Sequence, residues 1–100
     1  MPKLYEYLGI VIYFWSNEHD PVHVHGGCQG RESKAELHIE DGKVKEIRII
    51  NVKGRSPLDP AELRNFECLV QQKADEIVQK WIDYFVLRKK VSFEKITGKI

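Results

Sequence analysis

The sequence predicts an α+β domain in which a small antiparallel sheet of three to four strands packs on one long C-terminal helix. Segments that alternate or are rich in β-branched residues fill residues 8–52, and one helical pattern of apolar residues fills residues 60–88. Because the strands precede the helix, separate strand and helix regions are expected rather than alternating strand–helix units. The tail, residues 91–97, has room for a short final strand.

Length and composition indicate one domain over residues 1–100. The chain is 42% hydrophobic and 31% charged, and its formal net charge is +1. Its aromatic content and low net charge exclude intrinsic disorder, and the summed charge gives no general attraction to nucleic acid. The balance hides an asymmetry, because Asp and Glu are in excess in residues 1–42 and Lys and Arg in residues 43–100.

No segment predicts a membrane span or an export signal. The longest apolar run, Leu8–Trp15, is far shorter than the roughly 20 residues that cross a bilayer, and no cleavage pattern follows it. Cys28 and Cys68 lack C-x-x-C spacing and are expected to be free thiols. We therefore expect a cytoplasmic protein without membrane contact.

Alternation and turn residues position the strands. Gly9–Trp15 is apolar on both parities, so it is expected to be buried on both faces. If Gln29-Gly30 is a two-residue hairpin loop, His23 lies opposite Glu36 and His25 opposite Lys34.

A second hairpin is predicted at Asp41-Gly42, followed by a strand over residues 44–52. Val44 and Ile47 differ in parity within that strand, so a bulge near Lys45-Glu46 is needed to put both on one face.

Capping residues mark the start of the helix. Asp59 fits the N-cap, Pro60 the first helical position and Glu62 the third position of a capping box. From Leu63 to Phe85 the apolar residues form a stripe about 120° wide. The helix is expected to be roughly 40 Å long.

Histidines are the most informative side chains. His19, His23 and His25 lie within seven residues, and residues two apart on a strand share a face. The register above adds Glu36 and His38 to that face.

Three interpretations of this cluster stay open. His23, His25 and His38, or His19 in place of His38, could bind zinc, nickel or iron. Alternatively, His19, His23 and His25 could act as catalytic acids and bases, with Glu36 orienting His23. The third interpretation is a purely structural or interface cluster.

Basic residues gather in two further segments. Lys53 and Arg55 lie in the loop before the helix, and Arg88, Lys89 and Lys90 follow it. They are explained by solvation and by the helix dipole, or by contact with a phosphate or a partner.

The motif His19-x-Pro21-x-His23-x-His25, after the segment Gly9–Tyr13, resembles the signature of the bacterial domain-of-unknown-function family 4160. The Asp41-Gly42 turn and the late Trp81 also fit this family. Val22 departs from it, since a second proline usually precedes the middle histidine. The resemblance implies a cytoplasmic prokaryotic protein from a two-gene, toxin–antitoxin-like module, and it implies no reaction.

Three functions follow as hypotheses. The first is a protein-interaction component that forms a homodimer or binds a small protein encoded nearby, because one helix covers only one face of a strand that is apolar on both. The second is a metal-dependent or acid–base hydrolase acting on RNA. The third is a regulator that binds nucleic acid weakly. The sequence leaves open whether the protein is an enzyme.

Overall fold

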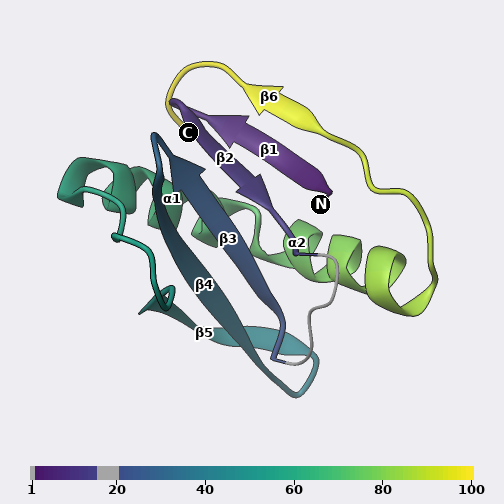
Figure 1. Ribbon diagram of the computed structural model, residues 1–100. Coiled ribbons are helices and arrows are strands. Elements are labelled where there is room, and N and C mark those ends of the chain that lie inside the picture. Colours follow the sequence, from purple (N-terminus) through teal and green to yellow (C-terminus); the bar gives the residue numbers. More distant parts are fainter. Residues whose placement is uncertain (1, 16–20) are drawn as a thin grey trace.

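The computed structural model describes residues 2–15 and 21–100, and it consists of one sheet with a helical layer on one face (Figure 1). Six strands follow the spatial order β5-β4-β3-β2-β1-β6. The strands are β1 (Lys3–Tyr7), β2 (Ile10–Tyr13), β3 (His23–Cys28), β4 (Arg31–Glu40), β5 (Lys43–Asn51) and β6 (Glu94–Ile96). The helices are α1 (Pro60–Gln72) and α2 (Ala74–Trp81), followed by a π-helical turn, η1 (Ile82–Val86).

The α+β class is confirmed, but the predicted three- to four-stranded antiparallel sheet is wrong. The sheet is mixed, because β6 pairs with β1 in parallel while the other neighbours are antiparallel. The first strand was missed because a bulge between Lys3 and Tyr5 buries Leu4 and Tyr5 together and removes the alternation. Leu8 and Gly9 do not begin a strand; with φ of 49° and 83° they form the β1–β2 turn.

The single long helix predicted over residues 60–88 is also wrong. The layer breaks at Lys73, whose φ and ψ are −107° and 14°, and it ends in η1. No Pro or Gly marks this break in the sequence, so it is imposed by packing on the twisted sheet. The predicted apolar stripe is present, because buried side chains from both helices face the sheet. No helix among the described residues is long and apolar enough to cross a membrane.

Both predicted hairpins are confirmed, as are the β3–β4 register and the bulge in β5. His23 lies opposite Glu36 and His25 opposite Lys34. Between β4 and β5 the register shifts as predicted, because Ile39 pairs with Val44 and His38 with Glu46, which leaves one extra residue, Lys45.

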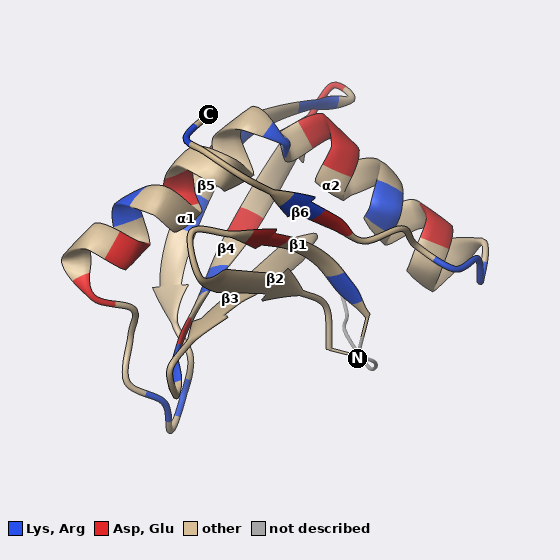
Figure 2. Cartoon of the chain, turned by 90° about the horizontal axis from the view of Figure 1, so that it is seen from above, with Lys and Arg blue, Asp and Glu red and all other residues tan. Residues whose placement is uncertain are grey.

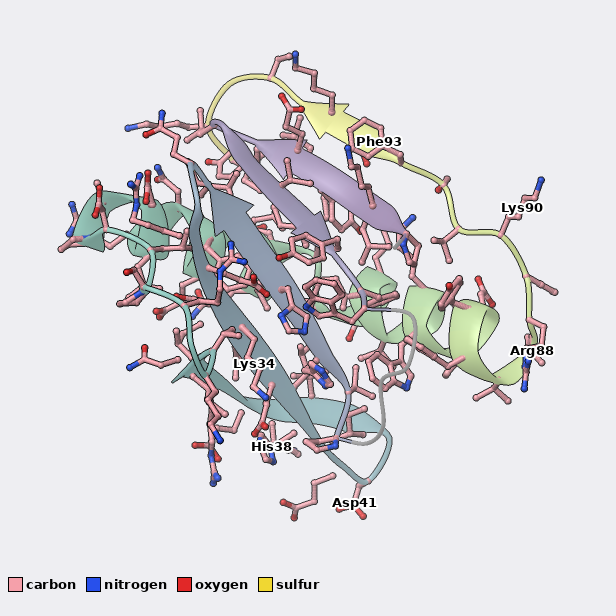
Figure 3. The ribbon with its side chains drawn as sticks, in the orientation of Figure 1. Lys34, His38, Asp41, Arg88, Lys90 and Phe93 are labelled. Carbon is pink, nitrogen blue, oxygen red and sulfur yellow. The ribbon has the colours of Figure 1, made fainter. Side chains whose placement is uncertain are left out.

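The two faces of the sheet differ in character. Gly26 faces the helices, and a Cβ atom there would lie 2.6 Å from the ring of Phe66. The core therefore fills the space between the sheet and the helices, with β2 at its centre. We call the opposite face the outer face; Figure 3 shows Lys34 and His38 on it, on the side turned to the reader. The register places Tyr13, His23, His25, Glu32 and Glu36 there as well.

An ion pair ties the start of α1 to the β3–β4 hairpin. The backbone N–H of Asp59 donates to Glu62 Oε1 at 2.9 Å, as the predicted capping box requires. Arg31 donates to both oxygens of Glu62, at 3.0 and 2.6 Å. The Arg31 guanidinium and the Asp59 N–H together lower the pKa of the Glu62 carboxyl to about 2.

Gly26→Ala is expected to lower the free energy of unfolding by about 1–3 kcal/mol, because the new methyl group would overlap the ring of Phe66. Urea denaturation measures the loss. Gly27→Ala is the matched control, because its methyl group would lie 3.3 Å from Tyr13 on the outer face. This variant should lower the free energy of unfolding by less than Gly26→Ala does. Adding Phe66→Leu to Gly26→Ala should recover part of the loss, and equal stability of the two alanine variants would contradict this explanation.

Candidate functional site

A buried histidine–carboxylate pair forms the centre of the outer face. His25 Nδ1 lies 2.9 Å from Glu32 Oε2, and the two residues are only 5% and 2% exposed. His25 comes from the middle of β3 and Glu32 from the start of β4. Gly27 lies directly opposite Glu32, so no opposing side chain occupies the space through which the carboxylate reaches the diagonal neighbour His25.

The Glu32 carboxylate is also held by two other side chains. Trp15 Nε1 donates to Oε2 at 3.2 Å, and Arg55 Nε lies 3.7 Å from Oε1. The backbone N–H of Glu32 donates to the carbonyl of Ser56 at 2.8 Å, which fixes the loop before α1 against the hairpin. A buried charge is tolerated where such partners surround it.

Three rings contact His25 of the pair, and a fourth extends the cluster through His23. The ring of Tyr13 stacks on His25 with centroids 5.5 Å apart, and Trp15 meets both rings edge-on. His23 lies 5.3 Å from His25 and 5.3 Å from Trp81, the last residue of α2. This packing fixes both imidazoles and connects His23 to the helical layer.

Hydrogen bonds define the tautomer of each imidazole. His23 Nδ1 lies 2.8 Å from the carbonyl oxygen of Pro21, which can only accept, so this nitrogen carries the hydrogen. The Glu32 carboxylate sets the same tautomer for His25. In each neutral ring the basic nitrogen is therefore Nε2.

The other predicted carboxylate, Glu36, belongs to a separate pair. It lies opposite His23 in the ladder, but its Oε1 is 3.1 Å from His38 Nε2, and both side chains are more exposed than the central pair. The predicted role of Glu36 in orienting His23 therefore has no matching hydrogen bond, and the structure provides Glu32 beside His25 instead. His19, a further predicted site residue, lies outside the described residues.

The predicted metal ligands His23, His25 and His38 do not come together as a set. Within residues 2–15 and 21–100, no three side chains of His, Cys, Asp or Glu are arranged to hold a metal ion. His38 bonds to Glu36, whereas His23 and His25 belong to the ring cluster.

The two predicted basic segments lie at opposite ends of the molecule (Figure 2). Arg55 belongs to the site through Glu32, and Lys53 lies two residues before it in the same loop. Arg88 and Lys90 lie beyond the helical layer, far from Lys34 and His38 in Figure 3, and Lys89 is between them. Of these two basic segments, the loop before α1 is the one that adds a cation, Arg55, to the site.

A shallow hollow of about 310 Å³ adjoins the central pair. It lies over the outer face of β2, and Val11, Tyr13 and Gly27 are among its lining residues. Tyr13 lines this hollow and also stacks on His25, so its ring connects the hollow to the central pair.

Sequence reasoning missed Glu32, Tyr13 and Trp15 as site residues. The predicted register already placed Glu32 on the histidine face, diagonally next to His25 and opposite a glycine, and this signal could have identified it. Tyr13 and Trp15 were assigned only to an apolar strand. Their places beside His25 depend on the pairing of β2 with β3, which the sequence does not specify.

Comparison with known families supports the resemblance. A family model described as a domain of unknown function, DUF4160, matches residues 9–82. The chain belongs to the DUF4160 family. The matched region of this DUF4160 protein contains β2 to α2 and every residue of the central pair and ring cluster. No curated protein and no solved structure matches the chain.

Glu32→Ala is expected to lower the free energy of unfolding by about 3 kcal/mol, because it removes the acceptor of His25 and Trp15 and leaves buried donors unpaired. Chemical denaturation measures this loss. Glu36→Ala is the matched control on the same strand and face; its partner is partly exposed, so the loss should stay below about 1 kcal/mol. Equal losses for the two variants would show that the His25–Glu32 pair stabilises the fold no more than the His38–Glu36 pair does.

Proposed function

We propose that this DUF4160 protein is an acid–base enzyme that cleaves RNA phosphodiester bonds, with His25 as general base and His23 as general acid. The observation that carries the proposal is the buried His25–Glu32 pair with a second imidazole 5.3 Å away. A carboxylate bound to Nδ1 orients an imidazole and stabilises its protonated form, which is what a general base requires.

The reaction needs two proton transfers and no further reagent. His25 Nε2 takes the proton of the ribose 2′-hydroxyl, and the 2′-oxygen forms a bond to phosphorus. The bond from phosphorus to the 5′-oxygen breaks, and the imidazolium of His23 donates a proton to the leaving oxygen. The products are a 2′,3′-cyclic phosphate and a 5′-hydroxyl end.

Glu32 and Arg55 add electrostatic support. Glu32 stabilises positive charge on His25 after the proton transfer. The Arg55 guanidinium lies 3.7 Å from Glu32 and lines the neighbouring hollow, so it can offset negative charge on a phosphate there.

Cleavage of a short labelled RNA by purified protein tests this proposal. His25→Ala and His23→Ala should each lower the rate by about 100-fold or more, the usual contribution of a general acid or base. His38→Ala should cleave normally, because His38 belongs to the separate Glu36 pair. A substrate with deoxyribose at the cleaved position should resist cleavage. Normal cleavage by a folded His25→Ala variant, or of the deoxy substrate, would overturn the proposal.

The interacting component of a two-gene module is the second candidate function. Tyr13 on the outer face of β2 is already buried by its own chain, so the apolar character of this strand on both faces does not require a partner. Two other features favour a partner: β5 ends the sheet with an unpaired edge, and Ile82, Val86 and Leu87 expose apolar surface, with Val86 65% exposed.

Light scattering distinguishes the interaction role from an isolated enzyme. If a second copy covers the apolar end of the helical layer, the protein is a dimer, and Val86→Lys shifts it to a monomer. Lys43→Ala on the exposed edge strand is the control and should keep the wild-type mass. A monomer at every concentration that also retains no protein encoded beside it would contradict the interaction role.

A further inference from the structure

The hollow over β2 has the features of a binding groove. Val11, Tyr13 and Gly27 lie along its length, and Gly27 keeps it open, because a Cβ atom there would lie 3.3 Å from the ring of Tyr13. His25 and Glu32 do not line the groove, but two of its lining residues, Tyr13 and Arg55, contact them.

Two cationic side chains from distant parts of the sequence line this groove. Lys3 comes from β1 and Arg55 from the loop before α1. Arg31 also borders the groove, but its guanidinium is bound by Glu62 and Asp59 on the side of the helical layer. Because β1 flanks β2 on one side and Arg55 contacts Gly30 of the β3–β4 hairpin on the other, a cation borders the groove on each side. This arrangement suits an elongated anion better than a single small ion.

The Arg55 guanidinium is held in place by the β3–β4 hairpin. It donates to the carbonyl oxygen of Gly30 at 3.3 Å. A guanidinium has five N–H donors, so this contact orients it without using all of them. Glu32, the carboxylate nearest to Arg55, is 2% exposed and therefore presents little negative surface to a ligand.

An exposed aromatic ring adjoins the cationic groove. Trp15 is 44% exposed, and its ring lies 5.8 Å from that of Tyr13 in the groove. Nucleic-acid bases stack on such rings when they are unpaired, and a duplex hides their faces.

We infer that this groove binds single-stranded RNA, with backbone phosphates between Lys3 and Arg55 and a base stacked on Trp15. The inference rests on the proposed cleavage function and specifies its substrate. The bound strand would pass His23 and His25, so that one of its phosphodiester bonds lies at the imidazoles.

Fluorescence anisotropy with a labelled oligouridine of about ten nucleotides tests the groove. The probe has 2′-O-methyl groups, so it cannot be cleaved through the 2′-hydroxyl. Lys3→Ala should weaken binding and reduce the slope of log affinity against log salt by about 0.7, the value for one phosphate contact on a single strand. Trp15→Ala should weaken binding about fivefold or more through lost stacking. Lys43→Ala, a cation on β5 outside the groove, should leave affinity and slope unchanged.

Further outcomes separate this inference from the cleavage proposal. If Lys3→Ala and Lys43→Ala have equal effects, or if a blunt RNA duplex or uridine monophosphate competes as well as the single strand, the groove assignment is wrong. If the probe binds as expected but unmodified RNA stays intact, the groove is the RNA-binding site and the cleavage proposal fails. If RNA is cleaved and the Lys3 and Trp15 variants bind like the wild type, the cleavage proposal holds and the groove is not the RNA-binding site.

Discussion

The buried carboxylate of Glu32 is the constraint on which the outer face depends. A carboxylate that is 2% exposed is tolerated in a protein where donors and cations surround it, and Glu32 has His25, Trp15 and Arg55. Each of these comes from a different segment: His25 from β3, Trp15 from the residues after β2 and Arg55 from the loop before α1. The need to satisfy one buried charge therefore brings three separate parts of the chain together, and the candidate site is built from the groups that do so.

Two adjacent glycines of β3, Gly26 and Gly27, make room for side chains on both faces of the sheet. Gly26 faces the helices and allows Phe66 to contact the sheet backbone, whereas Gly27 faces outward, leaves room for Glu32 and keeps the groove open. Because successive residues of a strand point to opposite faces, a pair of glycines removes one side chain from each face at the same position. The close packing of α1 and the open groove thus depend on one dipeptide of β3.

Elements that are set by neighbouring residues could be predicted from the sequence, whereas elements that are set by contacts between distant segments could not. Turn residues and alternation act within a few residues, and they were enough to predict the β3–β4 register, the Asp41-Gly42 turn and the bulge at Lys45. The break at Lys73 and the pairing of β6 with β1 depend on contacts between distant segments, so the sequence carries no local sign of them. The site was predicted in part for the same reason: strand period placed His23 and His25 together, but choosing Glu32 over Glu36 as the partner required knowing which opposing residue leaves room.

The different partners of the two histidines give them different chemistry although they share a face and a tautomer. His23 is bound at Nδ1 by a backbone carbonyl, which orients the ring but carries no net charge. His25 is bound at Nδ1 by a carboxylate, which orients the ring and also stabilises the imidazolium. A general base becomes positively charged when it takes a proton, and the carboxylate beside His25 can stabilise that charge. This is the physical reason for assigning the base to His25 and the acid to His23 in the proposed reaction.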